Sequence, residues 1–288
     1  MSIPIIMHVN YCEQGQTILE ICEKAVSWGY DGVEFRSKRT GVEETTEEYL
    51  DSIAEGVRKS GLKYVLFGGP GPNLNKPDKS AREAEIQWAI NFFRLASERF
   101  KLTVVNTFTG SLMNPTPGTP YSEYDKHGSF IATEDQWKWA TEFKELGKLA
   151  NELGFRFAFE THMNYIHDTP AAAMKLADLI DEPSVGVNLD YGNAVYFPKN
   201  PSIKETIKNL GDKLFYAHLK NSINVGGKRV ATSLADGEIN HREYLRTLKE
   251  TGFNGPICIE APRAGDREWY AQVDLAYFKS VMKDLGWV

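Results

Sequence analysis

Four residues that could bind a metal ion or transfer a proton each follow a short apolar run in the second half of the chain. Glu160 directly follows residues 155–159, which are aromatic or alanine except for one arginine. An ionised carboxylate at the end of a buried strand is costly unless it is paired or binds a metal. The other three are Asp190 after 185–189, His218 after 214–217 and Glu260 after 256–259. If the four strands are parallel neighbours, these side chains meet at one face.

Two glutamates, an aspartate and a histidine form a mixed oxygen and nitrogen donor set. Such a set suits one divalent cation with open positions, Mn²⁺ first and Mg²⁺ or Co²⁺ as alternatives. The adjacent carbonyl and hydroxyl oxygens of a sugar would fill those positions, and the ion would stabilise an enediolate. A glutamate bound through one oxygen keeps the other for proton transfer, so Glu160 and Glu260 are both predicted ligands and the acid/base pair.

The overall composition limits the class of protein. The chain has 288 residues, 42% of them hydrophobic, and a net charge of −6, which argues against a nucleic-acid partner and favours a small polar substrate. Three cysteines without framework spacing favour a reducing compartment. The N-terminal residues lack a basic, apolar leader pattern and no apolar run is long enough to span a membrane, so we expect a cytoplasmic protein without a membrane partner.

Strand and helix patterns alternate along the whole chain. We expect strands at 4–9, 31–35, 62–67, 102–108, 155–159, 185–189, 214–218 and 256–259. We expect helices at 17–28, 46–60, 78–100, 134–153, 201–210, 241–251 and 268–285, and a further helix that begins at residue 170. Eight such pairs with no spare element predict an α/β fold, a single (β/α)₈ TIM barrel domain over 1–288, with its active site at the C-terminal strand ends. The rival, an open doubly wound sheet, is disfavoured because residues 10–16 contain no dinucleotide fingerprint.

Two stretches between these elements are expected to be irregular. Residues 109–128 are rich in proline and glycine, and a loop of that length in a compact domain is usually a lid or a substrate wall. Residues 220–240 are expected to form a polar loop.

Several motifs carry a resemblance to a known family. They are Glu160-Thr161-His162, Asp190-Tyr191-Gly192-Asn193, His218-Leu219-Lys220-Asn221, and the runs 235–240 and 252–260. Over essentially its whole length the chain resembles the xylose isomerase-like barrels, in particular the branch of ketose 3-epimerases, inosose isomerases and dehydratases, and the related apurinic-site endonucleases. The resemblance implies one divalent cation on the four positions derived above, with the two glutamates as the acid/base pair.

Two departures from that family exclude one of its activities. Many relatives carry histidine where this chain has Asn193, and no Asp-X-His pair occurs in residues 226–230. A trinuclear zinc site is therefore not supported, and a DNA-repair function is rejected.

Further residues are expected around the substrate. His162 lies two positions beyond Glu160 and so points to the same side of an extended segment. The predicted substrate-binding residues are His162, Asn193, Lys220, His8 and Arg229. Glu34 could line the pocket floor or pair with Arg36 or Lys38. Surface or capping roles are expected for His127, His167 and His241.

The sequence therefore predicts a metal-dependent sugar isomerase or epimerase that works through an enediolate. A leaving group β to the carbonyl would make the same site a dehydratase or lyase of keto-sugars or cyclitols, and a non-catalytic sugar-binding barrel is the third hypothesis. The sugar, its phosphorylation and the oligomeric state, a homo-oligomer included, stay open.

Overall fold

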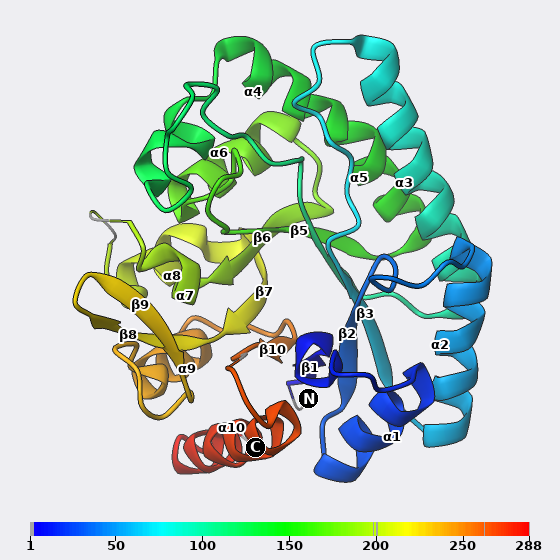
Figure 1. Cartoon of the computed structure of the whole chain (residues 1–288), viewed down its shortest axis with the longest axis vertical. Coiled ribbons are helices and arrows are strands. Elements are labelled where there is room, and N and C mark those ends of the chain that lie inside the picture. Colours follow the sequence, from blue (N-terminus) through cyan, green and yellow to red (C-terminus); the bar gives the residue numbers. More distant parts are fainter. Residues whose placement is uncertain (1–2, 198, 200, 262, 288) are drawn as a thin grey trace.

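Eight parallel strands close into a barrel in the computed structural model of the chain, which describes residues 3–197, 199, 201–261 and 263–287. The barrel order is β1-β10-β7-β6-β5-β4-β3-β2. The strands are β1 (Ile5–His8), β2 (Gly32–Arg36), β3 (Tyr64–Gly68), β4 (Val104–Thr107), β5 (Arg156–Glu160), β6 (Val185–Asp190), β7 (Leu214–Leu219) and β10 (Ile257–Ile259). Figure 1 shows them at the centre of the molecule. The predicted (β/α)₈ barrel is confirmed.

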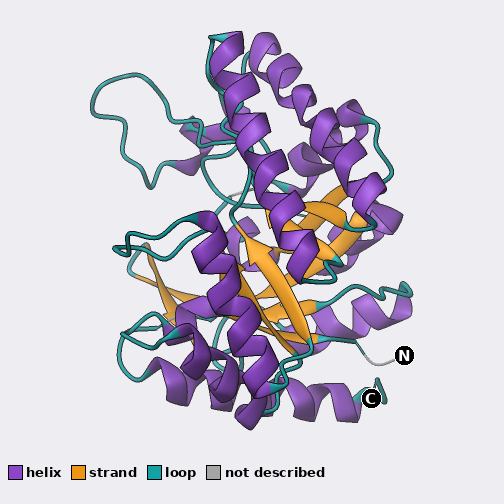
Figure 2. Cartoon of the chain, turned by 90° about the vertical axis from the view of Figure 1, so that its right-hand side faces the viewer, coloured by secondary structure: helices purple, strands orange, loops and turns teal. Residues whose placement is uncertain are grey.

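Helices surround the strands on the outside of the barrel (Figure 2). They are α1 (Ile18–Trp28), α2 (Thr46–Ser60), α3 (Lys79–Arg99), α4 (Glu134–Ala140), α5 (Lys144–Leu153), α6 (Pro170–Ile180), α7 (Tyr191–Ala194), α8 (Ile203–Leu210), α9 (His241–Glu250) and α10 (Arg267–Asp284). Their ends carry local stop and start signals: Thr169 caps α6, whose first residue is Pro170. None of these described helices is long and apolar enough to cross a membrane.

Two predicted elements differ from the structure. The helix expected over 134–153 is interrupted by a 3₁₀ turn at Thr141–Phe143. The polar loop expected over 220–240 contains an antiparallel hairpin of β8 (Asn221–Val225) and β9 (Lys228–Thr232), so the chain does have a spare element. Figure 1 shows this hairpin outside the ring of barrel strands. Because β9 is largely exposed, its sequence shows no apolar alternation. The usable signal was Gly226-Gly227, whose positive φ angles form the two-residue turn.

Side chains alternate between the inside of the barrel and the helical layer. On β5, Phe157 and Phe159 pack in the outer core, whereas Ala158 joins an inner cluster. That inner cluster consists of Ile6, Leu66, Val104, Ala158, Phe215, Tyr216 and Cys258. Glu160, two residues beyond Ala158, therefore lies on the inward side at the C-terminal end of the strand. The inner cluster is made of hydrophobic residues, so the polar side chains that could do chemistry lie at the C-terminal end of the barrel strands.

Three histidines predicted to have surface or capping roles are buried. His127, His167 and His241 are each at most 1% exposed. His127 Nδ1 accepts a hydrogen bond from the backbone N–H of Asn114, and Nε2 lies 3.0 Å from the carbonyl oxygen of Pro120. His127 thus anchors the 109–128 loop from inside. Burial lowers the pKa of His167 to about 3 and that of His241 to about 4. Local composition did not reveal this, because the loops around His127 and His167 bury their own polar residues and His241 lies at the start of α9.

Asp168 in the β5–α6 loop is a fully buried acid with little compensation. Its Oδ2 accepts a hydrogen bond from the Ser129 N–H at 3.0 Å, and its Oδ1 has no protein partner. Burial raises the pKa of Asp168 to about 6, although the bonds from Ser129 favour the charged form. The folded protein therefore retains a proton at Asp168 that the unfolded chain releases at lower pH.

Asp168→Asn is expected to stabilise the protein above pH 6. In the wild type the contribution of Asp168 to stability is complete below its ordinary pKa of 3.8 and is lost as the pH rises through about 6. This pKa difference of about two units corresponds to at most about 3 kcal/mol in the free energy of unfolding. Urea unfolding of both proteins at several pH values should show a difference that grows across this window. If the unfolding free energies of the two proteins, plotted against pH, stay parallel from pH 4 to pH 7, the prediction is wrong.

Candidate metal centre at the barrel mouth

The structure brings together the four residues that the sequence singled out. Glu160, Asp190, His218 and Glu260 each offer one ligand atom, and these atoms lie within 4.8 Å of one another. Strand register explains the convergence, because Asp190 on β6 is paired with His218 on β7. Glu260 follows β10, and its backbone N–H donates to the carbonyl oxygen of Leu219. The group can hold a divalent cation, while the identity of the ion remains a prediction.

Glu160 is held in place through both carboxylate oxygens. Oε2 accepts a hydrogen bond from Asn106 Nδ2 at 2.6 Å, and Oε1 accepts one from Asn193 Nδ2 at 3.1 Å. The residue is 4% exposed. Amide donors on both oxygens fix the direction of the carboxylate without neutralising its charge. The Glu160 carboxylate is thus held in one orientation, as a metal ligand or proton acceptor requires.

Glu260 has the most exposed side chain of the four, at 15%. Its Oε1 accepts a hydrogen bond from Asn10 Nδ2 at 3.1 Å, and its Oε2 lies 3.1 Å from His218 Nδ1. Burial would raise the pKa of Glu260, but Lys220, His8 and His218 outweigh it and hold the pKa well below the usual range. Glu260 is therefore a charged carboxylate that a small molecule can reach.

His218 uses its two ring nitrogens differently. Nδ1 faces Glu260, whereas Nε2 lies 3.0 Å from Oε2 of Glu34. Burial would lower the pKa of His218, but Glu34 and Glu260 outweigh it and raise the pKa well above its usual value. With Nε2–H donated to Glu34, Nδ1 is the nitrogen turned toward the other three ligand residues.

Lys220 places its ammonium group among the acids. Nζ lies 2.7 Å from Asp190 Oδ2 and 3.5 Å from Glu260 Oε2. Gly192 makes room for the lysine stem, because a Cβ there would lie 2.3 Å from Lys220 Cγ. Burial raises the pKa of Asp190 to about 6 even with the Lys220 ammonium beside it. One ammonium therefore compensates the acids only in part.

The charge balance of the cluster fits a divalent cation. Glu34, Glu160, Asp190 and Glu260 bring four carboxylates to a region whose positive charge comes from the Lys220 ammonium and from His218, whose pKa is raised. So many carboxylates out of water are costly unless further positive charge joins them. Oxygen donors with one imidazole suit Mn²⁺ or Mg²⁺, and the Glu34 contact to Nε2 is the usual support of a metal-binding histidine. The residues present thus fit the expected ion.

The predicted substrate-binding residues divide into two groups. His8, Asn193 and Lys220 lie at the cluster, and His8 Nε2 is 3.8 Å from Glu260 Oε1. His162 and Arg229 contact other groups. His162 packs beside Phe108 and Tyr165, and its Nδ1 lies 2.9 Å from the Met163 carbonyl oxygen. The substrate roles of all five remain predictions.

Arg229 is on the hairpin rather than at the four ligands. Its guanidinium pairs with Glu238 at 2.9 Å, donates to the carbonyl oxygen of Val195 and lies over the Tyr196 ring. It therefore ties β9 to the segment after α7.

Three residues at the centre were not singled out as site residues. Asn10 contacts Glu260, Asn106 contacts Glu160, and Tyr216 donates to Glu34. Asn106 stands near the end of an apolar run, as the three acids and the histidine do, so the same signal could have found it. Glu34 contacts His218 Nε2 at 3.0 Å, and its predicted place on a pocket floor stays a prediction. Arg36, its alternative partner, pairs with Glu13 instead.

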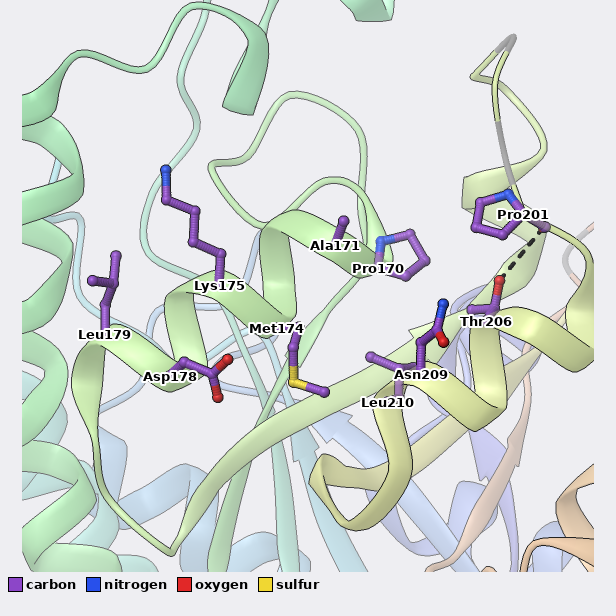
Figure 3. A pocket seen from close by; sticks show the side chains of 10 residues that line it. All are labelled: Pro170, Ala171, Met174, Lys175, Asp178, Leu179, Pro201, Thr206, Asn209 and Leu210. Atoms are coloured by element: carbon purple, nitrogen blue, oxygen red, sulfur yellow. Dashed lines mark hydrogen bonds between the residues drawn. The ribbon is translucent and has the colours of Figure 1, made fainter.

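A separate groove lies on the outer helical layer between α6 and α8, with a volume of about 550 Å³ (Figure 3). Met174, Leu179 and Leu210 line it, with Lys175 and Asp178 at its α6 side. None of the four ligand residues borders it. The groove is thus distinct from the barrel mouth.

Comparisons with known proteins show which family the chain belongs to. Residues 22–281 match the family described as Xylose isomerase-like TIM barrel. Inosose dehydratase of Clostridium perfringens is 27% identical over 150 residues, 46% of this chain and 50% of that protein. The chain thus spans about half the length of this relative.

Solved structures share the fold over nearly the whole chain. D-psicose 3-epimerase with D-tagatose from Clostridium cellulolyticum H10 is similar at a TM-score of 0.74 and 17% identity, covering 97% of this chain and 99% of that one. A xylose isomerase-like TIM barrel protein from Mycobacterium smegmatis in complex with magnesium is similar at a TM-score of 0.72 and 19% identity, covering 98% and 97%.

Proposed function

Because this chain belongs to the Xylose isomerase-like TIM barrel family, we propose that it is a divalent-metal-dependent isomerase or epimerase of a small sugar or cyclitol. The observation that carries the proposal is the convergence of Glu160 and Glu260, from different strands, on one cluster with Asp190 and His218. Mn²⁺ is the proposed ion. The free, buried cysteines are in keeping with a cytoplasmic location, which we also propose.

The two glutamates would transfer the protons. Glu260 is the more exposed of the two, so we assign to it the removal of a proton from the carbon beside a carbonyl. Glu160, held by Asn106 and Asn193, would act from another direction and return a proton to the enediolate. A divalent ion on the four ligands would supply Lewis acidity toward the carbonyl and hydroxyl oxygens of the sugar. Lys220 and His8 would stabilise negative charge on the substrate oxygens.

Elimination is the second candidate reaction, and the inosose dehydratase relatives favour it. If a hydroxyl group lies β to the carbonyl, the same enolate can expel it. The Lys220 ammonium, 3.5 Å from Glu260 Oε2, is then suited to give the departing hydroxyl a proton. Both reactions begin with the same proton removal, so the substrate would decide the outcome.

Incubation with Mn²⁺ and a panel of ketoses and keto-cyclitols in D₂O tests the proposal. Solvent deuterium in an isomerised or epimerised product supports the first reaction, and enone absorbance supports elimination. Saturable sugar binding without deuterium exchange would overturn both and leave a non-catalytic sugar-binding barrel. Mn²⁺-independent turnover would overturn the metal requirement alone.

A further inference from the structure

We propose that Glu34 is a positioning residue of the metal centre, which selects the nitrogen of His218 that faces the ion and, through Asn106, orients Glu160. The inference rests on the proposed metal-dependent function and extends it to a strand, β2, that contributes none of the four ligand residues. Its support is geometric, and it comes from four contacts around one carboxylate.

Glu34 is fully buried, and both of its oxygens are engaged. Oε2 accepts hydrogen bonds from the Tyr216 hydroxyl at 2.6 Å and from His218 Nε2 at 3.0 Å. Oε1 accepts one from Asn106 Nδ2 at 3.2 Å, and His8 Nε2 lies 3.6 Å away. A carboxylate with this many donors has one stable orientation. Glu34 can therefore serve as a fixed reference for the groups around it.

The first group that it orients is the His218 ring. Because Glu34 accepts the Nε2–H of His218, Nδ1 is directed at Glu260. Nδ1 also lies 3.8 Å from Glu160 Oε2. A ring turned by 180° would lose the bond to Glu34 and present carbon to the other ligand residues. Carboxylate partners of this kind fix the tautomer of a metal-binding histidine and increase its basicity.

The second group is Glu160, reached through one amide. Asn106 Nδ2 donates to Glu34 Oε1 at 3.2 Å and to Glu160 Oε2 at 2.6 Å. Asn188 Nδ2 donates to Asn106 Oδ1 at 3.1 Å, which sets the direction of the amide. Glu34 and Glu160 therefore share one donor, and a change at the first is transmitted to the second.

Gly68 at the end of β3 provides the space for this carboxylate. A Cβ at Gly68 would lie 2.1 Å from Glu34 Oε1 and 2.9 Å from its carboxyl carbon. Since the Glu34 side chain is fully buried, it has little room to move aside. Gly68→Ala should therefore displace the Glu34 carboxylate while keeping its charge.

Glu34, His218 and Cys258 also offer ligand atoms within 4.8 Å of one another, which raises a second metal site as an alternative. The contacts argue against it. Tyr216 and His218 already donate to Glu34 Oε2, and Asn106 donates to Oε1. An ion there would have to displace the donors that hold the Glu34 carboxylate. Support of the four-residue centre is thus the role that fits.

Glu34→Gln tests the proposal on the whole protein by titrating metal-free enzyme with Co²⁺ and recording its visible spectrum. Loss of a supporting carboxylate is expected to weaken Co²⁺ binding by about 10- to 100-fold. The Gln amide would also oppose the donor of Asn106 and so disturb Glu160, which should change the Co²⁺ absorption bands. A purely structural role would lower the thermal stability of the metal-free protein and leave these bands unchanged.

Glu142→Gln is the matched control, because it makes the same substitution at a glutamate that accepts from Arg82 through both oxygens in the outer helical layer. It should keep wild-type Co²⁺ affinity. If Glu34→Gln does not fold, Gly68→Ala is the test variant. It should weaken Co²⁺ binding by the same factor of about 10 to 100. Wild-type affinity and spectrum in the folded test variant would overturn the inference and leave the proposed function standing. A wild type that binds no Co²⁺ would overturn both.

Discussion

Glu160→Gln and Glu260→Gln are each expected to lower kcat by about 10²- to 10⁴-fold, the usual contribution of a positioned acid or base. Glutamine keeps the shape of the side chain and one oxygen, but it cannot accept the substrate proton. At Glu160 it must also place its amide N–H₂ against the donor of Asn106 or Asn193. Deuterium exchange from D₂O into the substrate measures the proton step directly.

The control separates lost catalysis from lost metal. Glu152→Gln changes a surface glutamate that pairs with Arg94, and it should retain full activity. Metal content of each purified variant shows whether the ion is still held. A folded Glu160→Gln or Glu260→Gln enzyme with wild-type kcat would refute the assignment of that glutamate as acid or base.

Asp190→Asn is expected to reduce metal affinity by more than the roughly 10- to 100-fold typical of a supporting residue, because it removes a ligand charge itself. The substitution should preserve the cap of α7. Asp190 caps α7 by accepting the Asn193 N–H at 3.1 Å, and an asparagine oxygen can do the same. The substitution would also remove a buried carboxylate whose pKa is raised by burial to about 6. Because the change also takes the 2.7 Å partner from the Lys220 ammonium, the metal-free variant should be less stable than the wild type.

Metal analysis after dialysis against a fixed Mn²⁺ concentration, together with thermal unfolding of the metal-free protein, checks this expectation. Asp178→Asn, at an acid on α6 in the outer groove, is the comparison variant and should retain its metal. Stoichiometric Mn²⁺ in Asp190→Asn would remove Asp190 from the ligand set.

The barrel and the meeting of the four residues could be predicted because both depend on local pattern. Glu160 follows a strand whose phenylalanines pack outward, and Gly154 ends the helix before that strand. Both limits of the strand could therefore be recognised in the sequence. Parallel strands in a closed barrel then bring such ends to one edge. The interrupted helix at Thr141–Phe143 and the exposed hairpin were missed because neither disturbs the apolar period of the core.

Contacts across the barrel could not be predicted in the same way. Glu34 and His218 are 184 positions apart and lie on strands that are not neighbours in the sheet. Asn10 reaches Glu260 over 250 positions. No spacing rule connects such pairs, because the curvature of the closed barrel decides which inward side chains touch. The same holds for His127, whose burial depends on how the long loop folds back.

The position of Glu260 directly after the last barrel strand also orders events during synthesis. Glu160, Asp190 and His218 leave the ribosome first, on strands that are neighbours in the sheet. β10 inserts between β7 and β1, and only then is the ring complete and the fourth donor in place. A nascent chain that stops short of β10 offers three donors on an open sheet. The complete four-donor set is therefore available to an ion only after translation has passed residue 260 and the barrel has closed.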